Sequence, residues 1–197
     1  AGRYALASGN RNEAEKLWPL IEWCLEYCHR QLNVDGVVKS DSDELENRFP
    51  AGKANLCTSS LYYDALISAA YLGKALKKEH KQIKSYQDRA AELYKNIDVY
   101  FARNVEGYDT YRYYDGNTVL RSWICIPLTM GIYEQAKGTV EALFSDKLWM
   151  ENGLLTQSGT STYWDRSTLY AFRGAYSCGA RAVSYTHLRA HETKANL

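Results

Sequence analysis

Apolar residues recur every three or four positions over much of the chain, which is the spacing of amphipathic α-helices. The clearest case is the stretch 11–32, where Asn10 is also placed to cap the start of the helix. The run 120–133 is instead apolar nearly all round and contains Pro127, so it predicts a buried helix that is kinked at the proline. Further helices are expected at about 59–76, 83–101, 135–144 and 167–183.

Three long stretches between these helices lose the periodicity, namely 33–57, 104–117 and 148–166. They alternate along the chain with tight turns near 77–80 and 133–135. Successive antiparallel helices joined in this order place every long loop at the same end of the array. The sequence therefore predicts an all-α fold of antiparallel helical hairpins, with the long loops gathered at one end.

Composition narrows the possible partners. The chain has 197 residues, and 24 Lys and Arg against 23 Asp and Glu leave a formal net charge of +1. Proteins that bind nucleic acid or a membrane surface normally carry a basic excess, so we expect neither partner. The 17 Tyr and 5 Trp suit half-exposed surfaces and sugar-stacking clefts, although they also serve ordinary cores.

The five cysteines form no CxxC pair and no metal-ligand spacing, so we expect no disulfide framework, no metal and no cofactor. Cys24 and Cys28 lie one helical turn apart among apolar neighbours, and we expect both thiols to face the core.

The first long loop contains a cluster of carboxylates followed by a cation and an aromatic ring. Where carboxylates are crowded, each charge disfavours ionisation of the next, and a carboxyl group that holds its proton near neutral pH can act as a general acid. The alternative is a solvated acidic loop, or a cation site made of hard oxygen ligands. The residues concerned are Asp41, Asp43, Glu44, Glu46, Arg48 and Phe49.

A second candidate cluster, Tyr163-Trp164-Asp165-Arg166, leads into the last predicted helix. Trp164 offers a stacking face, and Asp165 with Arg166 offers paired hydrogen-bonding groups for vicinal hydroxyls. The alternative is a helix start in which Asp165 lies at the positive end of the dipole and Trp164 is a hydrophobic plug.

The loop 104–117 is rich in tyrosine and could line a glycan groove, with Asp109, Arg112 and Asp115 beside the rings. A twisted hairpin with alternating tyrosines accounts for the same pattern equally well. The tyrosines concerned are Tyr108, Tyr111, Tyr113 and Tyr114.

Three of these segments resemble the six-hairpin, or α/α-toroid, glycosidases, a group that includes trehalases, glucoamylases and glycogen-debranching enzymes. The "LWP…W…DG" helix and turn of the debranching type resembles a stretch of this chain that consists of Leu17-Trp18-Pro19, Trp23 and the later Asp35-Gly36. The stretch 40–43, followed by Arg48-Phe49 and 60–66, resembles the "SGWD…RW…DLNALLY" segment. Residues 163–166 resemble the "YWRG" substrate-binding stretch.

The resemblance implies that Asp43 is the general acid of such an enzyme. This chain departs from the pattern with Ser42 in place of the tryptophan and with one extra residue before Arg48, which leaves Glu44 and Glu46 as alternative acids. It also has an extra residue, Asp165, before the arginine of the second segment. By resemblance, sugar-positioning residues are expected at Arg48, Phe49, Trp164, Asp165 and Arg166. Tyr111 of the tyrosine-rich loop is a further candidate for substrate binding.

For the whole chain, the resemblance implies part of an (α/α)6 toroid that acts on carbohydrate by an inverting mechanism. The stretch 17–183 is also similar to uncharacterised glycosidase-like proteins of gut Bacteroidetes type. Six predicted helices make about half of such a ring, so we expect 1–183 to be a partial domain, inactive by itself, whose catalytic base lies elsewhere. Residues 184–197 resemble a translated sequencing adapter, and we expect them to be a non-native tail.

Three other functions remain compatible with the sequence. A non-catalytic glycan-binding domain could use the same aromatic loops, and a lyase could use the same toroid. A helical scaffold for protein partners would leave an exposed apolar groove, with no convergence of the acidic loop and Trp164.

Overall fold

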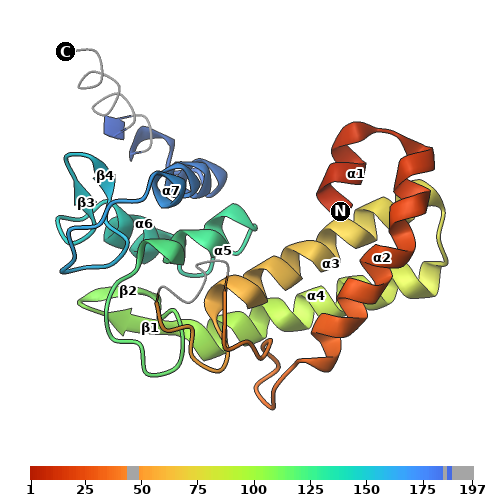
Figure 1. The fold of residues 1–197 in the computed structure, drawn as a ribbon, viewed down its shortest axis with the longest axis horizontal. Helices are drawn as coiled ribbons and strands as arrows, with labels where there is room; N and C mark the ends of the chain where they lie inside the picture. The colour runs from red at the N-terminus through yellow and green to blue at the C-terminus, as the bar shows by residue number, and fades with distance from the viewer. Residues whose placement is uncertain (44–48, 184–185, 188–197) are drawn as a thin grey trace.

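The computed structural model describes residues 1–43, 49–183 and 186–187. It is largely helical, with two short antiparallel hairpins, and the predicted all-α class is confirmed (Figure 1). The helices are α1 (Gly2–Ser8), α2 (Arg11–Arg30), α3 (Leu56–Leu76), α4 (His80–Phe101), the 3-10 turn η1 (Ser122–Ile124), α5 (Cys125–Thr129), α6 (Ala136–Leu143) and α7 (Asp165–Ser177). The strands are β1 (Ala102–Val105), β2 (Tyr108–Tyr111), β3 (Trp149–Met150) and β4 (Gly153–Leu154).

The helices α3 and α4 run side by side along the middle of the molecule (Figure 1). The amide of Thr58 donates to the side-chain oxygen of Asn55 at 2.8 Å, so Asn55 caps α3. Helix α3 is buried over most of its surface, whereas α4 buries one face that includes Ile83, Tyr86 and Ile97. The turn that joins them begins at Lys77, in the left-handed conformation (φ 59°) that ends many helices.

Helix α2 confirms its predicted cap, because the amide of Glu13 donates to the side-chain oxygen of Asn10 at 3.2 Å. Its buried face includes Trp18 and Leu25 and packs on α3. The expectation that both Cys24 and Cys28 face the core is wrong for Cys24, whose side chain is exposed. Each residue turns a helix by about 100°, so the residue just before Leu25 points away from the core.

The helix expected over 120–133 is shorter than predicted and comprises only η1 and α5. Leu120 and Ser122 instead bond to the third long loop: Ser158 N donates to Leu120 O at 2.9 Å, and Ser122 N to Thr156 O at 3.2 Å. The helix expected over 167–183 is also interrupted after Ser177, near Gly179, which has a φ of 90°. Contacts with a distant segment therefore override the local apolar pattern over 120–133, whereas the second break lies at a glycine in the left-handed region.

Close backbone approaches hold these shorter elements together. Helix α6 lies on β2, and a Cβ added at Gly138 would stand 1.8 Å from the carbonyl oxygen of Asp109. Helix α7 crosses α5 at Gly174, where an added Cβ would stand 2.8 Å from the Cβ of Leu128. At both crossings glycine allows a distance that a larger residue would prevent.

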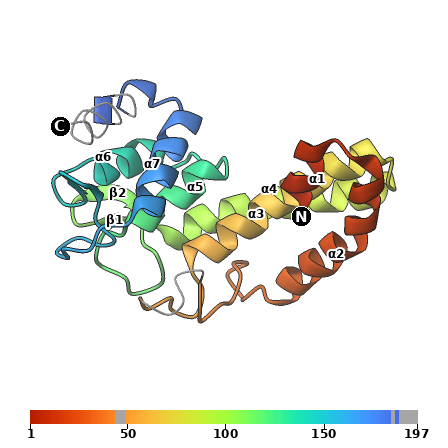
Figure 2. The same ribbon diagram turned by 45° about the horizontal axis from the view of Figure 1, so that its top comes forward.

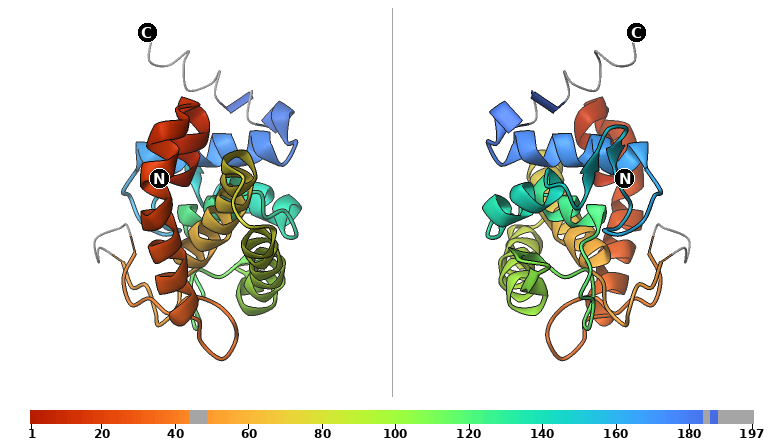
Figure 3. Two further views of the ribbon diagram at one scale, coloured as in Figure 1. Left: turned by 90° about the vertical axis from the view of Figure 1, so that its right-hand side faces the viewer. Right: turned by 90° about the vertical axis from the view of Figure 1, so that its left-hand side faces the viewer.

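The long loops meet on one side of the molecule, as predicted. Asn55 forms an antiparallel bridge with Tyr114, and Arg121 forms one with Gln157. Figure 2 shows the segment after α2 and the segment after β2 along the lower edge, and both views of Figure 3 place the segment before α7 on the same side. The loop tyrosines belong in part to a hairpin, since β1 pairs with β2 from Ala102–Tyr111 to Val105–Tyr108.

Candidate active site

Asp43 is held through both its side chain and the residue before it. The hydroxyl of Tyr113 donates to Oδ2 of Asp43 at 2.7 Å. Nδ2 of the Asn55 side chain donates to the carbonyl oxygen of Ser42 at 3.1 Å, and the same side chain caps α3. A carboxyl group fixed at the start of a central helix has a defined place in the fold, which a solvated loop carboxylate does not have.

Tyr113 is itself rigidly placed. Its side chain is fully buried, its amide donates to Oδ1 of Asn117 at 3.0 Å, and its carbonyl oxygen accepts from the amide of Leu56 at 2.9 Å. The first and second long loops are therefore joined at the start of α3, with the Asp43 carboxyl at the junction.

Arg121 lies beside this junction and is only 3% exposed. The centre of its guanidinium group is 5.2 Å from the ring centre of Tyr113, 5.3 Å from that of Tyr114 and 5.4 Å from that of Phe49. Its Nη1 donates to the carbonyl oxygen of Pro50 at 2.9 Å. These contacts tie the Phe49–Pro50 part of the first long loop to the second loop.

Burial lowers the pKa of Arg121 below its ordinary value, and the opposing effects of Tyr114, Tyr113 and Asp43 do not cancel it. An arginine remains charged at neutral pH even so. The site therefore combines a partly buried carboxyl group, a phenol and a buried cation.

A second cluster surrounds Trp164. Its ring stacks on that of Trp123 at 5.3 Å between centres and 11° between planes, and the guanidinium of Arg166 lies 4.6 Å from the ring centre of Trp164. Asp165 is exposed and is the first residue of α7, where a negative charge favours the helix dipole. Both the stacking and the helix-start interpretations of this stretch fit the geometry.

The two clusters are linked through the segment Arg121–Trp123. Arg121 contacts the Asp43 side, and Trp123, two residues later, contacts the Trp164 side. Two residues span at most about 7 Å along an extended chain. Tyr113, which binds Asp43, and Trp164 of the second predicted cluster thus contact residues that lie two positions apart in one segment.

The remaining residues predicted for the site are placed as follows. Phe49 is partly buried, with its ring against Arg121. Tyr111 is 1% exposed and lies near Asp98 of α4, and burial raises its pKa. The structure does not place Tyr111 beside Asp43. The predicted residues Glu44, Glu46 and Arg48 lie outside the described residues.

Sequence reasoning missed Arg121 and Trp123, although one signal was present. Arg121 is the only charged residue between Asp115 and Glu134 in the sequence. A single cation in an apolar run is usually paired or functional when it is buried.

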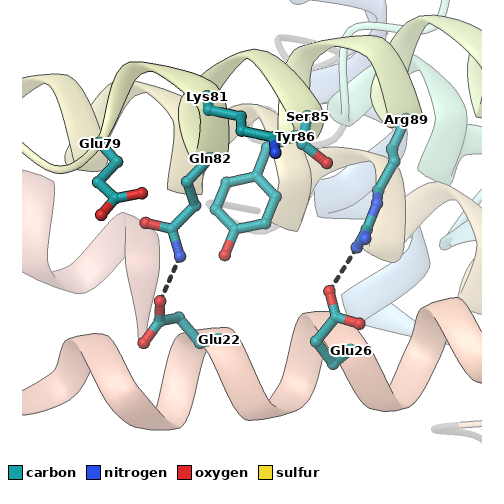
Figure 4. A pocket seen from close by; sticks show the side chains of 8 residues that line it. All are labelled: Glu22, Glu26, Glu79, Lys81, Gln82, Ser85, Tyr86 and Arg89. Atoms are coloured by element: carbon teal, nitrogen blue, oxygen red, sulfur yellow. Dashed lines mark hydrogen bonds and ion pairs between the residues drawn. The ribbon is translucent and has the colours of Figure 1, made fainter.

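A separate groove of about 310 Å³ lies between α2 and α4 (Figure 4). Gln82 donates to Glu22 across it, and Nη1 of Arg89 lies 2.6 Å from Oε1 of Glu26. The ring of Tyr86 lies between these two bridges (Figure 4). Two polar pairs therefore bridge α2 and α4 across this groove.

Within the described residues, no group of three or more His, Cys, Asp or Glu side chains is arranged to hold a metal ion. Cys24, Cys28 and Cys178 are free thiols. No helix in the described ranges is long and apolar enough to cross a membrane.

Comparison with known proteins shows a structural likeness to three glycosidases. A solved sialidase matches with a TM-score of 0.73 and 12% identity over 93% of this chain and 20% of its own. A GH78 family rhamnosidase from Bacillus sp. GL1 matches with a TM-score of 0.70 and 14% identity over 98% of this chain and 20% of its own. The neutral trehalase Nth1 from Saccharomyces cerevisiae matches with a TM-score of 0.60 and 18% identity over 77% of this chain and 33% of its own.

The chain thus spans between a fifth and a third of these structures and has the helical fold of the matching part. No protein-family model matches the sequence, and no curated protein sequence does. The finer resemblance to glycosidase-like proteins of gut Bacteroidetes type stays a prediction.

Proposed function

We propose that this chain belongs to a glycoside hydrolase in which Asp43 is the general acid. The observation that carries the proposal is the Asp43 carboxyl group, held at 2.7 Å by Tyr113. The Tyr113 ring packs on Arg121, which lies two residues before Trp123 of the stacked Trp123–Trp164 pair. A positioned carboxyl group and an aromatic surface linked by one short segment suit the cleavage of a bond between sugars. The fold shared with three glycosidases is consistent with this chemistry.

In the proposed reaction, the protonated carboxyl of Asp43 gives its proton to the glycosidic oxygen as the bond to the sugar carbon breaks. A second carboxylate takes a proton from a water molecule, which attacks that carbon from the opposite face and inverts its configuration. The two carboxyl groups of an inverting enzyme stand about 6.5–9.5 Å apart. We place the second carboxylate in a part of the full-length protein beyond this chain.

Substrate contacts are proposed for the Trp164 side of the site. Trp164 is partly buried and stacked, so it offers a rigid face, and Arg166 lies over its ring with its own side chain exposed. Asp165 is exposed beside them and can accept hydrogen bonds from sugar hydroxyls. Arg48 and Phe49 are proposed as further contacts on the strength of the resemblance, and Glu44 and Glu46 as alternative acids. Tyr111 is not proposed as a contact, because its side chain is buried and lies near Asp98 of α4.

The test uses the full-length product of the gene that carries this sequence, with oligosaccharides and aryl glycosides as substrates. We expect Asp43→Asn to lower kcat on natural oligosaccharides by about 10²–10⁴-fold. The loss should be much smaller on aryl glycosides with a good leaving group, because such a group departs without a proton donor. Glu26→Gln, in the α2–α4 groove, is the matched control and should keep full activity.

Three results would contradict the assignment. Equal losses on both substrate types would remove the acid role from Asp43, and a larger loss in Glu44→Gln or Glu46→Gln would transfer it. Sugar binding that depends on Trp164 but not on Asp43, with no hydrolysis by the wild type, would indicate a glycan-binding domain, which the stacked Trp123–Trp164 pair also suits.

A further inference from the structure

Arg121 lies where several separate parts of the candidate site meet. Its guanidinium contacts the rings of Phe49, Tyr113 and Tyr114, and its Nη1 donates to Pro50. Through its backbone, the same residue bridges Gln157 of the third long loop. One side chain and its backbone therefore connect all three loops.

We propose that Arg121 is a positioning residue, which fixes Tyr113 and the Phe49–Pro50 stretch and thereby holds the Asp43 carboxyl in one orientation. The connection runs from the guanidinium to the face of the Tyr113 ring, and from the Tyr113 hydroxyl to Oδ2 of Asp43. The consequence for catalysis rests on the proposed function, but the consequence for loop order does not.

Burying the charged guanidinium of Arg121 lowers the stability of the fold, and filling the same space does not require a charge. Nε of Arg121 is buried and has no hydrogen-bond partner among the described groups, and an apolar side chain of similar volume would avoid that cost. What the guanidinium adds is a planar cation that attracts several aromatic faces and a donor that reaches a loop carbonyl at the same time. A methionine in place of Arg121 would supply neither property, and a lysine would supply only the charge and a single-point donor.

The place of Arg121 in the sequence also matters, because the Arg121–Trp123 segment contacts both Tyr113, which binds the proposed acid, and the proposed sugar-binding surface. Arg121 orders the Asp43 side, and Trp123 carries the Trp164 face on which a sugar would stack. Ser122, between them, is fixed by its bonds to the carbonyl oxygen of Thr156. A rigid segment of this kind sets the distance between the acid and the sugar.

The first experiment measures amide hydrogen exchange in the full-length protein and needs no substrate. Arg121→Met removes the charge while keeping similar length, Arg121→Lys keeps the charge, and Arg89→Met removes a comparable arginine from the α2–α4 groove. We expect Arg121→Met to raise exchange of peptides covering 37–43 and 49–56 by at least about tenfold, with a smaller rise in Arg121→Lys. Arg89→Met should leave these peptides unchanged.

The second experiment measures kinetics on the same variants. Because a misplacement of about 1 Å can cost about 100-fold in rate, we expect kcat of Arg121→Met to fall by about 10–100-fold while KM changes by less than about threefold. Arg121→Lys should recover part of the loss. Circular dichroism checks that each variant is folded. If Arg121→Met does not fold, the exchange and kinetics of Arg121→Lys test the proposal.

Unchanged exchange in the two loop peptides would overturn the proposal, and so would a rise in KM at unchanged kcat, since that would make Arg121 a sugar-binding residue. A wild type that hydrolyses no glycoside would remove the proposed function instead. The exchange result would then still show whether Arg121 orders the loop.

Discussion

Arg89 and Arg121 show how differently one residue type is used in two regions of this molecule. Arg89 extends from α4 across an open groove to Glu26 of α2, in a single ion pair of 2.6 Å. Arg121 is 3% exposed, donates to a backbone carbonyl and lies among three aromatic rings. The first arginine joins two helices that are already formed, whereas the second holds loops that have no regular structure of their own.

The pKa values of the two residues express the same contrast. Partial burial lowers the pKa of Arg89, but the hydrogen bond and the charge of Glu26 outweigh it, so the pKa is raised overall. For Arg121 burial dominates and the pKa is lowered. An arginine that is buried at such a cost in stability is a better marker of a functional region than an arginine in a partly exposed ion pair.

The largest expected effect that separates the two regions is on the free energy of unfolding. Arg121→Ala leaves a cavity between the rings, removes the donor to Pro50 and withdraws the cation beside Asp43, so we expect a loss of about 2–4 kcal/mol. Arg89→Ala removes a half-solvated ion pair and should cost about 1 kcal/mol or less. Urea denaturation followed by circular dichroism measures both, and equal losses would contradict the contrast.

A second effect concerns Tyr62, whose buried hydroxyl lies near the guanidinium of Arg89. Burial raises the pKa of Tyr62 to about 12. The unfolded chain releases this proton near pH 10 and the folded chain does not, so stability is complete below pH 10 and is lost as the pH rises towards 12.

We expect the free energy of unfolding of the wild type to fall between about pH 10 and pH 12 by up to about 2 kcal/mol more than that of Tyr62→Phe. At pH 7 the two proteins should differ by less than about 1 kcal/mol, because Tyr62→Phe removes only a hydroxyl that forms no well-aligned hydrogen bond. Parallel pH profiles for the two proteins would show that Tyr62 does not keep its proton in the fold.

The smallest effect is the coupling between Arg89 and Glu26. A double-mutant cycle with Arg89→Met and Glu26→Gln should give about 0.5 kcal/mol, since both side chains are partly exposed. About 1 M NaCl should remove most of this coupling while leaving most of the Arg121→Ala penalty in place. A coupling that salt does not weaken would mean that the groove is less solvated than its geometry indicates.

The candidate site could be predicted only in part. The pattern around Asp43 and the stretch around Trp164 marked two groups of residues, and the alternation of long loops and tight turns placed them at one end of the fold. Tyr111 was singled out by its aromatic neighbourhood, but it is buried in β2, on which α6 packs. Tyr113, two residues later, reaches Asp43 instead, and nothing in the local pattern distinguishes the two tyrosines.

The sequence alone determined the long helices α2, α3 and α4, because an apolar stripe of period 3.6 is a local property that any window of the chain displays. Only the tertiary structure decided the partners of Asp43 and Arg121, which lie 70 and 71 positions away at Tyr113 and Pro50. It also shortened the helix expected over 120–133, because Leu120 and Ser122 bond to the loop before α7. Contacts at such separations depend on how the helices pack, and no local periodicity specifies them.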